Sequence, residues 1–213
     1  MTTKIHFISV EKTATVVTSG NTDASNIWLI LHGYGQHAEH FQKEFSLLDE
    51  KDHYCVFPEA LHRFYLKSGK GDTGASWMTK YQREADILDN NHYLDKVYSH
   101  FILPFIDASK HFIVLGFSQG AASLIRWLAY SNVNVDKIVL WGAVFPPDMQ
   151  KDEYLKLLTR HQWYYFIGDE DEFISDEEKI RQKIFFEQHK FKIRWIEYKG
   201  KHHILPDILL KNL

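Results

Sequence analysis

The sequence predicts an α/β fold in which helices cover both faces of a mostly parallel sheet, with an antiparallel N-terminal hairpin at one edge. Short, continuous apolar runs recur along the chain, as expected of strands that are buried on both faces. Segments with apolar residues at helical spacing lie between these runs. The 213 residues, of which 45% are hydrophobic, are enough for one domain spanning residues 1–213.

The alternation of strands and helices can be placed along the chain. The predicted buried strands are 27–31, 54–57, 112–115, 138–141, 163–167 and 193–198. The predicted helices are 37–49, 84–107, 118–130, 150–159, 176–189 and 204–210. Ser175 is the expected N-cap of the helix at 176, because a serine hydroxyl accepts a hydrogen bond from a free N–H of the first turn.

Two further segments carry weaker signals. Residues 5–10 and 13–18 are rich in β-formers and are joined by Glu11 and Lys12, which predicts the antiparallel hairpin. Residues 67–76 are rich in glycine and predict a mobile surface loop.

Composition excludes several classes of function. The net charge of −3, with both signs interspersed, gives no basic surface for nucleic acid. No apolar stretch approaches the roughly 20 residues of a membrane span, and the N-terminus lacks the apolar core of a signal peptide. The single cysteine, Cys55, excludes an intramolecular disulfide and is expected in the core. A soluble, cytoplasmic protein is therefore expected.

The most informative segment is 116–120, Gly-Phe-Ser-Gln-Gly, between a predicted strand and a predicted helix. A serine in so tight a turn exposes its hydroxyl, and only glycine fits at the flanks. The helix that begins there directs free N–H groups and its positive end toward the serine. Ser118 is therefore predicted to be a nucleophile, and the competing interpretation is an ordinary Gly-Ser-Gly surface turn.

The loop after strand 27–31 reads His-Gly-Tyr-Gly-Gln. Glycines on both sides of Tyr34 allow a tight turn that presents backbone N–H groups. The N–H groups of Tyr34 and Gln119 are predicted to form an oxyanion hole, which stabilises the negative charge that develops on a carbonyl oxygen under attack. The competing interpretation is an ordinary strand-to-helix turn, which also favours glycine.

The loops after the last two strands hold candidates for the partners of the serine. Four acids, residues 169–172, follow strand 163–167, and any of them can orient a base. His202 and His203 follow strand 193–198, and either can be that base. The order serine, acid, histidine along the chain is that of the α/β-hydrolase triad. The histidine pair lacks the cysteine or spaced histidine partners of a zinc site, so no metal is expected.

These motifs resemble the α/β-hydrolase superfamily, and most closely the small phospholipase/carboxylesterase family that includes acyl-protein thioesterases. The matching segments are 31–35, 116–120, 168–171 and 200–204. The resemblance implies a single α/β-hydrolase domain with Ser118 as nucleophile, Asp171 as the orienting carboxylate and His202 as the base, with His203 as the alternative base. One departure is Glu172, which stands where family members often carry proline.

The resemblance implies hydrolysis of a small-molecule ester or thioester through an acyl-enzyme, without cofactor or metal, and it allows a homodimer. Region 63–83 matches no motif of the family, and we expect it to shape the substrate groove. Trp77, Tyr65 and Phe145 are candidates for lining this groove. The alternative function is a catalytically inactive α/β-hydrolase scaffold that binds a ligand or a protein. Dienelactone hydrolysis is a further alternative, but it usually uses a cysteine nucleophile at the position that Ser118 occupies here.

Overall fold

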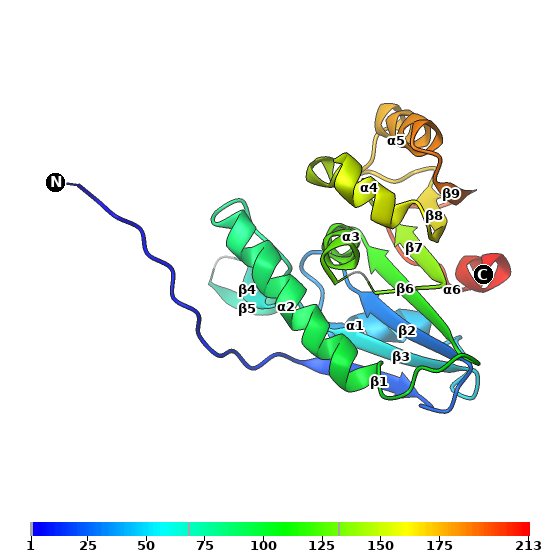
Figure 1. The fold of residues 1–213 in the computed structure, drawn as a ribbon, viewed down its shortest axis with the longest axis horizontal. Coiled ribbons are helices and arrows are strands. Elements are labelled where there is room, and N and C mark those ends of the chain that lie inside the picture. The colour runs from blue at the N-terminus through cyan, green and yellow to red at the C-terminus, as the bar shows by residue number, and fades with distance from the viewer. Residues whose placement is uncertain (1, 68, 132) are drawn as a thin grey trace.

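A computed structural model of the protein describes residues 2–67, 69–131 and 133–213. Its main sheet has seven strands in the order β1-β3-β2-β6-β7-β8-β9 (Figure 1). The strands are β1 (Val16–Gly20), β2 (Asn26–Leu31), β3 (His53–Pro58), β6 (His111–Phe117), β7 (Lys137–Trp141), β8 (Gln162–Gly168) and β9 (Lys192–Tyr198). All neighbours are parallel except β1 and β3, which are antiparallel. The predicted fold class, a mostly parallel sheet with an antiparallel edge, is confirmed.

Helices cover both faces of this sheet. One face carries α2 (Arg83–Phe101), α3 (Gln119–Ser131), α4 (Asp152–Leu158) and α5 (Asp176–Gln188). The other carries α1 (Ala38–Phe41), the 3₁₀ turn η1 (Gln42–Phe45) and α6 (Pro206–Asn212), while η2 (Pro147–Met149) precedes α4. Side chains alternate between the two cores, since Phe112 and Val114 of β6 pack on the first face and Ile113 and Leu115 on the second. Within the described ranges, no helix combines the length and the apolar character that crossing a bilayer requires.

The six predicted buried strands correspond to β2, β3 and β6 to β9. The predicted N-cap is also present, because Ser175 Oγ accepts a hydrogen bond of 3.3 Å from the N–H of Glu178. The helix predicted over 84–107 ends earlier, at Phe101, since Pro104 disfavours helical geometry in the residue before it. Cys55 on β3 is buried, as expected of a core cysteine, and burial raises the pKa of its thiol to about 12.

The predicted N-terminal hairpin is not present. Residues 2–15 form no strand, and β1 alone makes the antiparallel edge (Figure 1). The carbonyl of Thr15 accepts a hydrogen bond of 2.9 Å from Glu59, which holds the chain in line with β1. Beyond this point Ile5 and Ile8 are 68% and 87% exposed, so a hairpin arm here would have no second layer in which to bury its apolar face.

The predicted mobile loop at 67–76 is also corrected. It belongs to a two-stranded antiparallel sheet made by β4 (His62–Lys67) and β5 (Lys70–Ser76), while Ser68 lies outside the described residues. Gly69 and Gly71 have φ angles of +71° and +84°, conformations that glycine adopts without strain. The glycines therefore mark the turn of a hairpin, and region 63–83 is largely ordered structure.

A buried histidine joins the end of β2 to its surroundings. His32 Nε2 accepts a hydrogen bond of 3.0 Å from the N–H of Ala60. Nδ1 therefore carries the hydrogen and donates it to the carbonyl of Gly33 at 2.7 Å. Burial lowers the pKa of His32 to about 4, so the folded protein holds this imidazole neutral.

His32 should make the free energy of unfolding depend on pH. Its pKa is about 4 when folded and near 6.5 when unfolded, so the unfolded chain binds one more proton between these values. The contribution of His32 to the free energy of unfolding is therefore fully present above pH 6.5. It is lost as the pH falls toward 4, by about 1.4 kcal/mol per pH unit. Urea unfolding from pH 7 to pH 4.5 should show stability falling with pH in wild type, to which His53 and His161 also contribute because burial lowers the pKa of each. In His32→Gln the slope should be lower by about one proton. Equal slopes in the two proteins would contradict the assignment.

Candidate functional site

Ser118 lies between β6 and α3 in a left-handed backbone conformation, with φ of +52°. Its N–H donates a hydrogen bond of 2.9 Å to the carbonyl of Trp141 on neighbouring β7, and its carbonyl accepts one of 3.1 Å from Ala121. Left-handed geometry is rare for a residue with a side chain and costs on the order of 1–3 kcal/mol. The strand-to-helix turn predicted around Ser118 is thus present and strained.

The two flanking glycines allow this turn. A Cβ atom at Gly116 would lie 2.4 Å from the Cα of Ala121, and one at Gly120 would lie 2.4 Å from the carbonyl oxygen of His32. Both contacts involve backbone atoms, which cannot rotate away. The first turn of α3 therefore packs directly on the residue before the Gly33–Tyr34 turn.

Asp171 and His202 lie in contact, after β8 and β9 respectively. His202 Nδ1 is 2.7 Å from Asp171 Oδ2, and Asp171 Oδ1 accepts a hydrogen bond of 3.0 Å from the N–H of Phe173. The carboxylate is fully buried. Burial by itself raises the pKa of Asp171, but the hydrogen bonds from His202 and Phe173 outweigh it and keep that pKa below its ordinary value. Asp171 is therefore a carboxylate near neutral pH, and it fixes the orientation of the imidazole.

The His202 ring lies beside the turn that carries Ser118. Its centroid is 4.9 Å from the ring of Phe117, the residue before the serine. A Cβ atom at Gly142, which follows β7, would lie 3.0 Å from the same imidazole. Within the described ranges no residue forms a hydrogen bond with Ser118 Oγ. His203 is exposed and makes no ion pair with Asp171, so the structure brings Asp171 together with His202 rather than with His203.

The other three acids of the loop have different surroundings. Asp169 Oδ1 accepts a hydrogen bond of 2.9 Å from the N–H of Gly200, and Glu172 Oε2 accepts one of 3.4 Å from the N–H of His202. Glu170 is exposed, but its N–H donates to the carbonyl of Gly200 at 3.0 Å. These bonds tie the acidic loop to the histidine loop, which holds Asp171 beside His202.

The predicted oxyanion donors are Tyr34, on the loop after β2, and Gln119, at the start of α3, and these two segments pack together where Gly120 meets His32. Among the described residues, none accepts a hydrogen bond from the N–H of Tyr34 or from that of Gln119. Both groups therefore remain available to a ligand. The Tyr34 side chain is 60% exposed and lies 5.0 Å from the ring of Phe64.

Two of the three predicted groove residues belong to the core instead. Trp77 and Phe145 are both 0% exposed, so neither surface is open to a substrate. Phe145 packs in an aromatic cluster with Phe186 and Trp163. Tyr65 differs, since it is 54% exposed on β4. Large aromatic residues are used both in cores and in grooves, so the sequence alone could not separate these cases.

Two residues near His202 were not predicted from the sequence. Gly142 has φ of +55° and leaves room for the imidazole. The ring of Phe173 lies 4.7 Å from that of His202, although its side chain is 74% exposed. A glycine directly after the predicted strand 138–141 was the available signal for Gly142, while nothing in the sequence indicated the position of Phe173.

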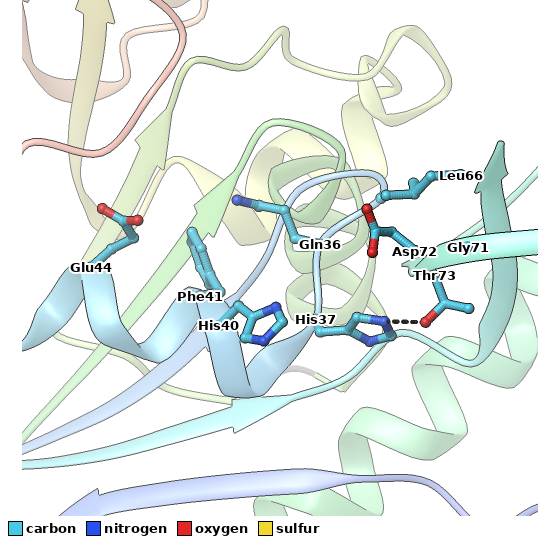
Figure 2. A pocket seen from close by; sticks show the side chains of 10 residues that line it. Gln36, His37, His40, Phe41, Glu44, Leu66, Gly71, Asp72 and Thr73 are labelled. Atoms are coloured by element: carbon cyan, nitrogen blue, oxygen red, sulfur yellow. Dashed lines mark hydrogen bonds between the residues drawn. The ribbon is translucent and has the colours of Figure 1, made fainter.

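A cavity of about 560 Å³ opens beside the loop that carries Tyr34. Figure 2 shows the side chains of α1 and η1 on one side of it and those of the β4–β5 hairpin on the other. A hydrogen bond of 3.0 Å between His37 Nε2 and Thr73 Oγ1 joins the loop before α1 to β5 in the wall of the cavity. The lining combines polar and apolar residues: Gly35, Gln36, His37, His40, Phe41, Glu44, Leu66, Gly71, Asp72 and Thr73.

Several solved structures share this fold. Acyl-protein thioesterase 2 of Zea mays superposes with a TM-score of 0.69 at 15% identity, over 94% of this chain and 96% of that one. Esterase PE8 gives 0.68 at 16% identity, over 93% and 95%. The carboxylesterase of Bacillus cereus gives 0.66 at 15% identity, over 93% and 91%. These likenesses show the fold.

The family is shown by the sequence itself. No curated protein matches the chain. However, the model of the family described as serine hydrolase (FSH1) matches residues 23–207. This range includes the turn at 116–120, the acidic loop 169–172 and both histidines. The match extends over most of the chain and favours a hydrolase over an inactive scaffold. The chain therefore belongs to the serine hydrolase (FSH1) family.

Proposed function

We propose that the protein hydrolyses carboxylic esters or thioesters through an acyl-enzyme formed on Ser118. The observation that carries this proposal is the 2.7 Å contact between His202 and the buried Asp171, beside the strained turn that presents Ser118. An imidazole fixed by a carboxylate and placed beside an exposed hydroxyl is the arrangement that activates a serine. The esterases and the thioesterase of similar fold support this substrate class by analogy.

In the proposed mechanism Ser118 Oγ attacks the substrate carbonyl while His202 Nε2 takes the hydroxyl proton. Asp171 stabilises the imidazolium that forms, and the N–H groups of Tyr34 and Gln119 bind the tetrahedral oxyanion. His202 then gives the proton to the leaving alcohol or thiol, and a water that His202 activates hydrolyses the ester on Ser118. A contact between serine and base that forms only with substrate present is common in such enzymes, which agrees with the unbonded hydroxyl.

We also propose that the cavity beside Tyr34 receives the part of the substrate that extends away from the reacting carbonyl. One of its walls is the loop 35–37, which directly follows the proposed oxyanion donor. Phe41, which also lines the cavity, lies 5.8 Å from the ring of Phe117, the neighbour of Ser118. The mixed lining supports substrates that carry both an apolar chain and a hydrogen-bonding group in that part.

Replacing the nucleophile should abolish activity without affecting the fold. Ser118→Ala should lower the hydrolysis of p-nitrophenyl butyrate by at least about 10³-fold, because no acyl-enzyme can form. The matched control is Ser123→Ala on α3, whose buried hydroxyl has no hydrogen-bond partner among the described residues and should be dispensable. Mass spectrometry after treatment with a fluorophosphonate should find one adduct, on Ser118. An unlabelled wild-type protein would instead support the inactive scaffold.

The two adjacent histidines give a paired test of the base. His202→Gln should lower kcat by about 10³-fold or more, since it removes the proton acceptor. His203→Gln should stay within about threefold of wild type, because that side chain is exposed and has no contact with Asp171. Steady-state kinetics with p-nitrophenyl acetate make the comparison, and the reverse pattern would assign the base to His203.

Filling the cavity should discriminate between substrates by size. His40 lies on α1 and lines the cavity (Figure 2), so His40→Trp should occupy part of its volume. We expect KM for an ester with a longer acyl chain, such as p-nitrophenyl octanoate, to rise about tenfold while p-nitrophenyl acetate is hydrolysed as before. The control is His92→Trp, an exposed position on α2. Equal KM values in the two variants would remove the cavity from the substrate site.

A further inference from the structure

The segment 75–78, which we call the strap, runs from the end of β5 past the proposed oxyanion hole. At its start, the carbonyl of Ala75 accepts a hydrogen bond of 2.8 Å from the N–H of Gly35. The N–H of Ala75 in turn donates one of 3.1 Å to the carbonyl of Gln36. The strap therefore fixes the backbone directly after Tyr34.

The next part of the strap fixes the backbone before Tyr34. Trp77 Nε1 donates a hydrogen bond of 2.8 Å to the carbonyl of His32, and the indole is 0% exposed. The ring centroids of Trp77 and His32 are 5.3 Å apart. Tyr34 is thus held between two attachment points, one at residue 32 and one at residues 35–36.

The same strap also holds the other proposed donor. The side chain of Gln119 accepts a hydrogen bond of 3.0 Å from the N–H of Trp77 at Oε1 and donates one of 3.0 Å from Nε2 to the carbonyl of Met78. Both ends of the amide are therefore used by the strap. The strap itself is anchored to α2, since Asn90 Nδ2 donates to the carbonyl of Trp77.

We propose that Trp77 and the side chain of Gln119 are positioning residues, which set the spacing between the Tyr34 and Gln119 N–H groups that bind the oxyanion. This inference rests on the proposed hydrolase function. Donors stabilise a transition state only if they already point at the place where the charge develops, and small displacements cost much of the rate. Trp77 contacts both donor segments. Its indole N–H binds the carbonyl of His32, two residues before Tyr34, and its backbone N–H binds the side chain of Gln119.

The test is Trp77→Phe, which keeps an aromatic ring in the core but removes the hydrogen bond to His32. The matched control is Trp163→Phe. Trp163 is also 0% exposed and lies in the same hydrophobic core as Trp77. It donates through Nε1 to a backbone carbonyl, that of Leu158 at 3.0 Å, which belongs to neither donor segment. A general loss of core packing should affect both variants, and thermal unfolding of each measures that loss.

We expect Trp77→Phe to lower kcat for p-nitrophenyl acetate by about 10- to 100-fold with KM within about twofold of wild type, because only the transition state carries the oxyanion. The affinity for an alkyl boronic acid, which forms a tetrahedral adduct on a serine, should fall in proportion to kcat. Trp163→Phe should change neither quantity. Equal kcat and boronate affinity in wild type and Trp77→Phe would overturn the inference.

A second variant keeps the inference open to test if Trp77→Phe does not fold. Gln119→Ala retains the backbone N–H but removes both side-chain bonds to the strap, and it should show the same loss of kcat and of boronate affinity at constant KM. Unchanged kinetics in this variant would also overturn the role of the strap. A wild-type protein that neither turns over the ester nor is labelled by fluorophosphonate would instead refute the proposed function.

Discussion

The left-handed backbone at Ser118 is the constraint on which the site depends. It costs energy that must be offset by the surroundings, and those surroundings are visible in the structure. The N–H of Ser118 is bonded to β7, and the glycines at 116 and 120 remove the side chains that would collide with Ala121 and His32. Because β6 lies between β2 and β7 near the middle of the sheet, the strained turn is supported from both sides.

The parallel sheet then determines what can meet this turn. Loops at the carboxyl ends of β7, β8 and β9 lie side by side, which brings Gly142, Asp171 and His202 together although they are far apart in the chain. Gly142 has positive φ and no side chain, so it leaves the space that the imidazole fills. A residue with a Cβ here would push His202 away from Asp171. The arrangement of the three loops is therefore a property of the fold, and the chemistry of the site follows from it.

The parts that could be predicted from the sequence are those with local signals. Apolar runs marked six strands, of which the edge strand β9 is only partly buried, and the Gly-Phe-Ser-Gln-Gly segment marked the turn at Ser118. The errors concern long-range contacts. The β-rich segment 5–10 stays outside the sheet because no second layer is available to cover it, and the glycines of 67–76 form the turn of a hairpin. Trp77 illustrates the difference most clearly. Its type suggested a groove, whereas the two hydrogen bonds that it donates, to residues 45 and 42 positions away, place it in the strap.

The departure at Glu172 has a physical explanation that the sequence could not supply. The acidic loop needs the N–H of residue 173, which donates to Asp171 Oδ1, and proline at 172 would leave that donor in place. Glutamate adds a second link, since its carboxylate accepts from the N–H of His202 across the two loops. The next residue, Phe173, lies against the imidazole. The loop is thus held by hydrogen bonds to the histidine loop at Asp169, Glu170 and Glu172, where a proline would have held it by restricting one backbone angle. The loop that carries Asp171 is therefore held by the loop that carries His202. As a result, the position of the carboxylate is coupled to the position of the proposed base.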